Sequence, residues 1–274
     1  MKKKLSILFF VIILFFGMAI FFFYNNGNKK NESTDTEKQR KRKGVYYEAL
    51  NKKAVKGKYN PLASYGYSSL YYNGKVYTSN SINRISCSSA EYRSLQRKEL
   101  SAVYGNRYIY WSADSADLFE VTGEGTLYQL KEFNIDKRVC LQPKDSDYMN
   151  IYDCLNGIWL LQGKDLYKDI FHLDNAKEVY AKTSDNTAVL VESNDDVFSA
   201  FFSSLCEAKF IPEENVPEFE DDEGNYFLFK DAFGIQTEIQ IFAEGYVIFF
   251  SPEKTRYVIK LDKQICNKIY TKYF

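Results

Sequence analysis

The chain has 274 residues, of which 45% are hydrophobic and 17% aromatic, and its 36 Lys and Arg balance 36 Asp and Glu. Residues 1–4 hold three of the basic groups, and residues 29–43 hold seven basic and three acidic groups, so 26 basic and 33 acidic groups remain elsewhere. This net-acidic remainder lacks the positive surface of nucleic-acid-binding proteins, and we therefore expect no nucleic-acid partner.

After a short N-terminal tail of residues 1–4, residues 5–24 form an uncharged apolar stretch that runs from Leu5 to Tyr24. As a helix it would rise about 1.5 Å per residue and span about 30 Å, the thickness of the hydrocarbon core of a bilayer. The stretch is longer than the apolar part of a signal peptide, and no small-x-small cleavage site follows it. The sequence therefore predicts an uncleaved transmembrane anchor and a single-pass protein of the cell membrane.

The charges that flank the anchor bear on its orientation. Lys2, Lys3 and Lys4 favour a cytoplasmic N-terminus, whereas seven basic residues on the other flank favour the opposite. Because moving three lysines and the terminal amine across a membrane is unfavourable, we expect the C-terminal domain to be extracytoplasmic. Residues 25–44 contain no large apolar residue, and we expect a flexible basic stalk. Its basic run, residues 40–43, is interpreted as a solvated flank, with attraction to anionic lipid or wall polymer as the alternative.

The rest of the chain is long enough for a large core. We expect an α+β fold, a mostly antiparallel β body with a few covering helices, divided into a β-rich domain (45–188) and a small α+β domain (189–274). The chain contains 23 tyrosines and 22 phenylalanines. Codon bias and the preference of aromatic residues for strands explain many of them, and an aromatic surface for glycan or peptide ligands is the alternative.

The first region is predicted to consist mostly of strands. Its strongest signal is a hairpin, because two strand-like runs flank Asn73-Gly74, whose residues tolerate positive φ. A second hairpin is predicted around Gly123-Glu124-Gly125, and these glycines lack the spacing of a dinucleotide-binding loop. The predicted strands are residues 68–72, 75–78, 107–111, 118–121, 126–130, 138–141 and 151–161, and the predicted helices are residues 90–103 and 165–173.

The second region combines two helices with antiparallel strands, an arrangement typical of an α+β layer. Asn194 or Asp195 is the predicted cap of the first helix, and Asp262 is the predicted cap of the terminal helix. An acidic loop (212–224) and strands at residues 225–229, 236–242, 246–250 and 256–261 lie between them. The apolar faces of the two helices carry Val197, Phe198, Phe201, Phe202 and Leu205, and Ile265, Ile269 and Tyr273.

Five cysteines occur without any CxxC pair and beside a single histidine, so a zinc site is not expected. We expect buried thiols that behave as small hydrophobic residues. If the body lies outside the cell, an odd number of cysteines leaves at least one thiol without a disulfide partner. If all the cysteines are free thiols, they favour a body in the reducing cytoplasm. Cys140 and Cys154 are the pair expected to lie closest. The others are Cys87, Cys206 and Cys266.

No catalytic, cofactor-binding or metal-ligating residue is assigned from the sequence. His172, the only histidine, has apolar neighbours and is expected to be a satisfied, partly buried imidazole rather than a catalytic base. Paired carboxylates for glycoside hydrolysis need a separation that only the fold sets, and nothing in the sequence selects a pair.

Acidic residues cluster at three places. Glu218, Glu220 and residues 221–223 are interpreted as a solvated loop, because their spacing does not match a calcium-binding EF-hand. Two further pairs, Asp114 with Asp117 and Asp145 with Asp147, are expected in turns, where aspartate is common.

Two segments, residues 117–141 (DLFEVTGEGTLYQLKEFNIDKRVCL) and the C-terminal GYVIFF…VIKLDKQICNKIY, resemble stretches of uncharacterised membrane- or lipid-anchored proteins of low-GC Gram-positive bacteria. The resemblance covers about a third of the chain. It contains no motif with a mechanism, so no functional residue is carried over. It implies a bacterial envelope protein.

Our leading hypothesis is therefore a non-enzymatic membrane-anchored protein with a binding or accessory role in the bacterial envelope. Its partner would be an envelope protein, a peptide or a glycan, and no cofactor is expected. The alternatives are a carboxylate-dependent enzyme that acts on cell-wall polymers and a cytoplasmic-facing membrane regulator.

Overall fold

The computed structural model describes residues 43–50, 68–79, 83–105, 109–112, 123–183, 185, 187–192, 194–217, 225–253 and 255–274. The predicted tail, the predicted anchor (5–24) and nearly all of the predicted stalk lie outside these ranges, as do the acidic cluster at residues 218–223 and the pair Asp114 and Asp117. None of the helices in the described ranges has the length and apolar character needed to cross a membrane. The compact unit Val45–Phe274 contains the elements described below.

Within this unit, a first sheet has the strand order β3-β2-β6-β5-β7-β8-β9-β4. All its neighbouring strands are antiparallel except β2 and β6, which are parallel. The strands are β2 (Ser68–Tyr72), β3 (Lys75–Ser79), β4 (Arg84–Ser86), β5 (Arg97–Gly105), β6 (Ile109–Ser112), β7 (Gly123–Leu130), β8 (Arg138–Pro143) and β9 (Tyr148–Asp153).

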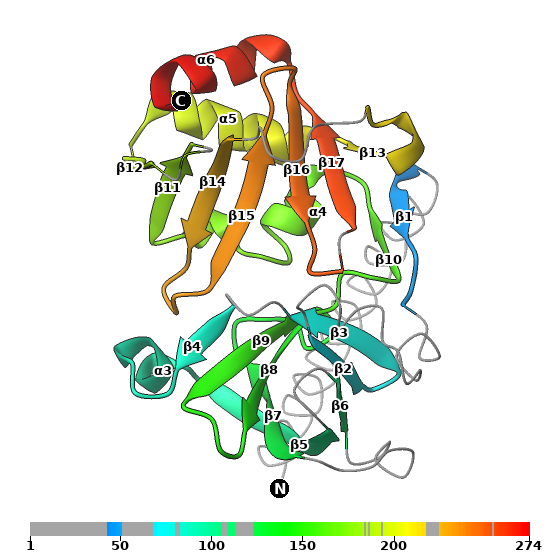
Figure 1. Ribbon diagram of the computed structural model, residues 1–274. Coiled ribbons are helices and arrows are strands. Elements are labelled where there is room, and N and C mark those ends of the chain that lie inside the picture. Colours follow the sequence, from blue (N-terminus) through cyan, green and yellow to red (C-terminus); the bar gives the residue numbers. More distant parts are fainter. Residues whose placement is uncertain are drawn as a thin grey trace, which may run out of the picture. The chain divides into compact units, whose positions relative to one another are not determined.

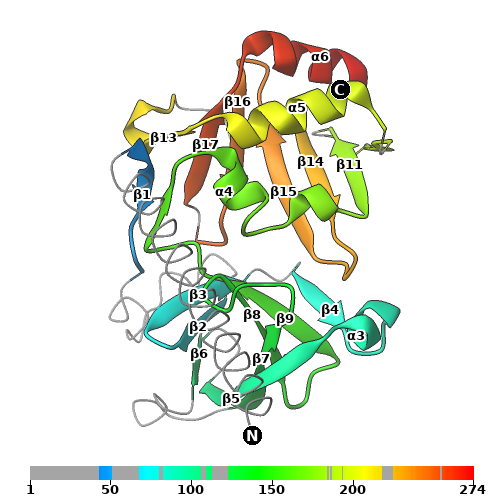
Figure 2. The same cartoon turned by 180° about the vertical axis from the view of Figure 1, so that it is seen from behind.

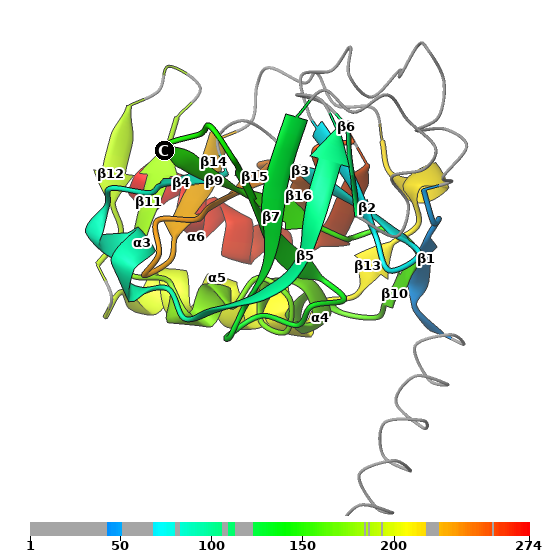
Figure 3. The same ribbon diagram turned by 90° about the horizontal axis from the view of Figure 1, so that it is seen from below.

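An additional pairing of β3 with β9, at Thr78 and Asp153, closes this first sheet on itself (Figures 1 and 3). Apolar side chains fill the closed sheet, and none of those in the cluster is more than 2% exposed: Leu70, Tyr77, Val103, Leu127, Val139, Leu141, Tyr152 and Cys154. The interior of the closed sheet is therefore a packed core.

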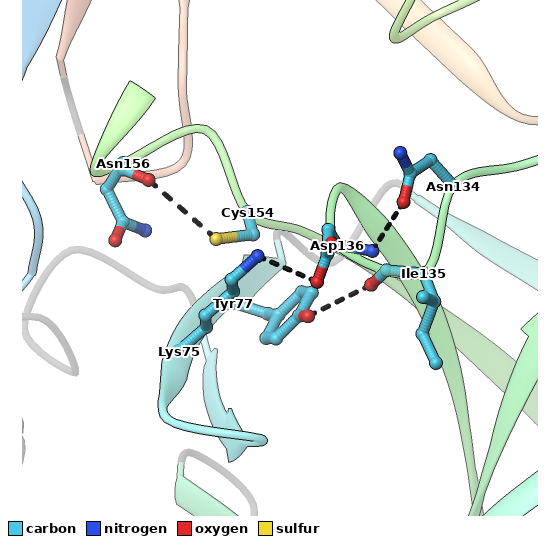
Figure 4. Close-up of polar contacts among 7 residues, drawn as sticks. All are labelled: Lys75, Tyr77, Asn134, Ile135, Asp136, Cys154 and Asn156. Atoms are coloured by element: carbon cyan, nitrogen blue, oxygen red, sulfur yellow. Dashed lines mark hydrogen bonds and ion pairs between the residues drawn. The ribbon is translucent and has the colours of Figure 1, made fainter. Parts of the chain in front are cut away.

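The turn at residues 134–136 is fastened to strand β3, as Figure 4 shows. The Tyr77 hydroxyl donates to the Ile135 carbonyl oxygen at 2.9 Å, and Lys75 Nζ lies 2.7 Å from an Asp136 carboxylate oxygen. The Asp136 backbone N–H donates to the Asn134 side chain at 2.9 Å, which shapes the turn.

Several predictions for the first region are wrong, and the strand expected at residues 118–121 lies outside the described residues. The strand expected at residues 151–161 ends at Asp153, and a separate strand, β10 (Ile158–Leu160), pairs outside the first sheet. The helix expected at residues 90–103 is limited to α3 (Ala90–Ser94), which Ser89 caps, because residues from Arg97 onward pair with β7. The turn expected at residues 123–125 is the beginning of β7. A Cβ atom on Gly125 would lie 2.9 Å from the Gln142 carbonyl oxygen, so this glycine permits the close approach of β8. The hairpin at Asn73-Gly74 is confirmed, with φ of 47° and 76°.

A second, entirely antiparallel sheet has the order β12-β11-β14-β15-β16-β17-β13. It begins at Glu178, within the predicted first domain, and the independence of residues 45–188 and 189–274 stays a prediction. The strands are β11 (Glu178–Lys182), β12 (Ala188–Leu190), β13 (Phe210–Ile211), β14 (Asn225–Lys230), β15 (Gln236–Ile241), β16 (Tyr246–Phe250) and β17 (Arg256–Lys260).

Helices α4 (Gly163–Tyr167), α5 (Asp196–Glu207) and α6 (Lys263–Tyr273) pack against the second sheet (Figure 2). The predicted caps are confirmed, since Asp195 accepts hydrogen bonds from Val197 N and Phe198 N and Asp262 accepts one from Gln264 N. The predicted helix at residues 165–173 is shorter and begins at Gly163. The remaining elements are η3 (Leu173–Asn175), η4 (Glu213–Asn215) and a two-stranded sheet of β1 (Val45–Tyr47) and β10 (Ile158–Leu160).

The mostly antiparallel, β-rich α+β fold is therefore confirmed, and many aromatic residues lie in its cores. Phe198, Phe201 and Phe202 on α5 meet Phe227 and Phe229 on β14 with ring centroids 5.1–6.0 Å apart. Exposed large apolar side chains in the described ranges are few: Tyr46, Tyr148, Val189 and Leu190. This part of the chain uses phenylalanine for packing.

Two hairpin tips of the second sheet contact the first sheet. At the β14–β15 tip, Ile235 packs in one cluster with Ile85, Leu130 and Met149. At the β16–β17 tip, the Thr78 hydroxyl donates to Glu253 Oε2 at 2.7 Å. The sheets are thus joined by both apolar packing and polar contacts.

Candidate anion-binding site

A hollow of about 760 Å³ lies where α3, the start of β5 and the end of β7 meet. Four of its eight lining residues are cations, and none is a carboxylate. Glutamines, a tyrosine and a leucine supply the rest. The lining residues are Tyr92, Arg93, Leu95, Gln96, Arg97, Lys98, Gln129 and Lys131.

The pairing of β5 with β7 assembles this hollow from distant parts of the sequence. Arg97 lies opposite Leu130, and Lys98 lies opposite Gln129. The Lys131 backbone N–H donates to the Gln96 carbonyl oxygen at 2.9 Å and extends the pairing beyond the strands. Leu95 and Leu130 are buried beneath, with 8% and 0% exposure, so the polar lining rests on packed side chains.

The guanidinium group of Arg97 is held by two aromatic rings. Its central carbon lies 4.1 Å from the ring centroid of Tyr92 and 5.3 Å from that of Tyr128. The Tyr92 hydroxyl donates to Gln142 Oε1 at 3.0 Å, and Gln142 Nε2 lies 3.3 Å from Cys87 Sγ, which fixes the Tyr92 ring. Stacking uses the face of a guanidinium and leaves its N–H donors at the edge for an acceptor.

Within the described residues, no ion pair includes a cation of the hollow. Lys131 Nζ donates to the neutral Gln96 side chain at 2.7 Å. A solvent-exposed group of cations attracts anions.

The sequence analysis missed this site because it assigned residues 90–103 to one helix. Arg93, Arg97 and Lys98 are close in the sequence, but three basic residues on a predicted helix indicate only a solvated charged face. Nothing in the sequence places Gln129 and Lys131 beside them, since strand pairing alone does so. The one feature of the sequence that could have indicated this site is the group of three basic residues close to the N-terminal cap of α3.

The residues singled out from the sequence lie elsewhere. His172 is half-buried at φ 55°, and its ring lies edge-on to Phe133 with centroids 5.2 Å apart. Asp145 and Asp147 are exposed in the β8–β9 turn. Within the described ranges, no group of three or more His, Cys, Asp or Glu side chains is arranged to hold a metal ion.

All five cysteines are free thiols, and only Cys87 is not fully buried. Cys140 lies opposite Ile151, whereas the Cys154 backbone N–H donates to the Lys137 carbonyl oxygen, so the two side chains belong to different clusters on opposite faces. The two are not register partners, and the expectation that they are the closest pair of cysteines stays a prediction. Burial raises the pKa of the Cys154 thiol to about 11, which makes it a poor nucleophile.

Buried Asp153 and the half-buried Asp231 and Glu253 lie between the two sheets and not at the hollow. Asp153, 5% exposed, accepts hydrogen bonds from Arg138 at 2.6 and 3.1 Å. Burial raises the pKa of Glu253 and of Asp231. The hydrogen bonds that each carboxylate accepts lower its pKa, but the effect of burial is larger. Asp231 accepts two of these from Phe233 N and Ile235 N in its own turn.

The raised pKa of Glu253 predicts a contribution to the pH dependence of stability that Glu253→Gln should remove. Because the pKa of Glu253 is higher in the folded state than in the unfolded state, the wild type loses stability as pH rises from the unfolded pKa through the folded one. We therefore expect the free energy of unfolding of Glu253→Gln, minus that of the wild type, to rise with pH across this window. Above the window this difference should stay constant.

Denaturant unfolding at a series of pH values from about 4 to 8 measures this difference. Glu213→Gln is the control, since the Glu213 side chain is 61% exposed and its variant should follow the wild type closely. A difference between Glu253→Gln and wild type that stays constant with pH would contradict the assignment.

The comparisons with known proteins return no relatives. The sequence matches no protein-family model and no curated protein, and the fold matches no solved structure.

Proposed function

We propose that the chain is a membrane-anchored envelope protein whose extracytoplasmic body binds an anionic ligand. Residues 5–24 would be the anchor and residues 25–44 the stalk. The observation that carries the proposal is the hollow beside α3, with four cations and no carboxylate in its lining.

The charge distribution supports local binding at this hollow. Outside residues 1–4 and 29–43 the chain carries 26 basic and 33 acidic groups, so this part of the chain is net acidic. A positive hollow on such a body draws an anionic ligand to one place, because the surrounding charge disfavours other positions.

The lining also favours binding over reaction. Arginine, lysine and glutamine donate hydrogen bonds to anionic or polar groups. Among the lining residues there is no pair of nucleophile and general base of the kind that covalent catalysis uses. This composition supports an accessory or binding role.

The five free thiols favour one second candidate, a cytoplasmic-facing membrane regulator. In that case the same hollow would bind a cytoplasmic anion. The side of the membrane on which the body lies separates the two candidates.

One experiment on cells that make the full-length protein tests the proposal. In one measurement, intact cells are treated with a membrane-impermeant protease. In a second measurement, the protein is purified from gently solubilised membranes of untreated cells. A quadruple variant, with Arg93, Arg97, Lys98 and Lys131 all changed to Gln, is compared with the wild type. We expect protease to release the body. We expect anionic material, measured as phosphorus, uronic acid or acidic peptide, to co-purify with the wild type and not with this quadruple variant.

The control variant changes four exposed cations outside the hollow, Arg84, Lys209, Lys263 and Lys268, to Gln and so carries the same net charge. It should retain the co-purifying material. Equal recovery from both quadruple variants would refute binding at the hollow, and cleavage only after lysis would refute the extracytoplasmic placement and support the regulator.

A further inference from the structure

We propose that the anion bound in this hollow is a phosphate-bearing group and that Arg97 is its principal recognition residue. This inference rests on the proposed binding function and specifies its ligand.

The number of cations favours an anion with more than one charge. Arg93, Arg97, Lys98 and Lys131 surround one hollow without a lining carboxylate. A carboxylate carries one negative charge, whereas a phosphate monoester carries about 1.5 to 2 at neutral pH and offers three acceptor oxygens. A polymer of linked phosphates brings several charges into the same hollow. Phosphate chemistry thus matches the local excess of positive charge.

The geometry of Arg97 favours recognition of a planar or tetrahedral oxyanion. Its guanidinium group is stacked on Tyr92 at 4.1 Å and lies near Tyr128 at 5.3 Å. Contact with the two rings restricts the guanidinium group before a ligand arrives, so less conformational entropy is lost on binding. Two parallel hydrogen bonds from the fork of N–H donors to oxygen atoms are the usual arginine–phosphate contact.

The rest of the lining argues against a neutral sugar as the main ligand. Arg97 occupies one face of the Tyr92 ring, so this face is not open for stacking on a sugar ring. Leu95, the only aliphatic residue of the lining, is 8% exposed. Gln129 and Gln96 offer amide groups that can hydrogen-bond the hydroxyl groups of a phosphate-bearing polymer.

The test measures binding of two soluble polyanions to the full-length protein in a neutral detergent. The probes are short inorganic polyphosphate and a polyglutamate with the same number of charges, titrated by calorimetry at fixed ionic strength. We expect the wild type to bind polyphosphate more tightly than polyglutamate. Arg97→Lys keeps the charge but removes the fork and its stacking, and should weaken polyphosphate binding about tenfold.

Arg84→Lys is the matched control. The Arg84 guanidinium is also stacked on a tyrosine, Tyr148, at 4.6 Å, but Arg84 is not part of the hollow. Its variant should bind polyphosphate like the wild type. Unchanged far-ultraviolet circular dichroism and unfolding midpoint in both variants show that any loss of affinity is local.

A phosphate headgroup of a lipid and a phosphate polymer present the same chemistry, and nanodiscs separate them. If phosphatidylglycerol discs lower the polyphosphate affinity of wild type relative to neutral discs, and not that of Arg97→Lys, the lipid headgroup is a source. If both discs give the same affinity, the soluble polymer is the source. Both results support a phosphate ligand.

Two outcomes overturn the inference, and they differ in what they leave standing. Polyglutamate binding that equals or exceeds polyphosphate binding and depends on Arg97 refutes the phosphate assignment but retains an anion-binding hollow. No Arg97-dependent binding of either probe refutes the hollow as an anion site, and the proposed function fails with it.

Discussion

Replacing Arg138 by Met is expected to lower the free energy of unfolding by about 3–5 kcal/mol, because it leaves the carboxylate of Asp153 buried without its cation. Arg138 is 1% exposed, and its Nε and Nη2 donate to the two Asp153 oxygens at 2.6 and 3.1 Å. Its guanidinium carbon also lies 4.7 Å from the Phe133 ring centroid and 5.3 Å from that of Phe171.

The position of this ion pair explains why the effect should be global. Asp153 on β9 pairs with Thr78 on β3 at the point where the first sheet closes, and Phe171 precedes the second sheet. Loss of Arg138 therefore disturbs both sheets. Denaturant unfolding followed by tryptophan fluorescence measures the change.

Lys144→Met is the control for this prediction, because Lys144 and Glu124 form an ion pair with side chains 67% and 53% exposed. Exposed pairs contribute at most about 1 kcal/mol. The double variant Arg138→Met/Asp153→Leu should be more stable than Arg138→Met alone, since no buried charge is left. Equal stability of Arg138→Met and Lys144→Met would contradict the structure here.

Phe227→Ala is the second large change, with an expected loss of about 3–5 kcal/mol in the free energy of unfolding. Phe227 on β14 is 0% exposed. Its ring centroid lies 5.1 Å from that of Phe198, 5.3 Å from Phe201 and 5.9 Å from Tyr273, so one side chain joins the sheet to α5 and α6. Truncation leaves a cavity that three elements line.

Unfolding curves of Phe227→Leu and Val189→Ala make the comparison specific. Leucine keeps most of the apolar volume and should cost less than alanine. Val189 is 47% exposed on β12, and its truncation should change stability by less than about 0.5 kcal/mol. A loss at Phe227→Ala no larger than at Val189→Ala would show that the aromatic cluster does not hold α5 and α6 on the sheet.

One wrong helix prediction explains why the candidate site was not expected from the sequence. Residues 90–103 carry Tyr92, Leu95 and Leu100 at helical spacing. The helix stops at Ser94 because eight of the nine residues of β5 pair with β7. Pairing of a strand along its length outweighs a weak helical preference. The same pairing brings Lys131 to Gln96, so the error in secondary structure and the missed hollow have one cause.

The sequence by itself determined the elements that local chemistry defines. Asn73-Gly74 set the β2–β3 hairpin through positive φ, Asp195 and Asp262 capped their helices, and the alternating strands between residues 225 and 261 were assigned nearly to the residue. The apolar stretch at residues 5–24 is equally explicit as a predicted anchor. Turns, caps and periodicity depend on neighbours within a few residues, so the sequence states them directly.

Only the tertiary structure decided which distant residues meet. The closure of the first sheet at Thr78 and Asp153, the burial of Arg138 and the cationic hollow beside α3 each join segments that are far apart in the chain. Gly125 belongs to a strand because β8 passes close to its α-carbon, a contact that no local pattern reveals. Strand pairing and packing are long-range, and they placed four cations around one hollow on an otherwise acidic body.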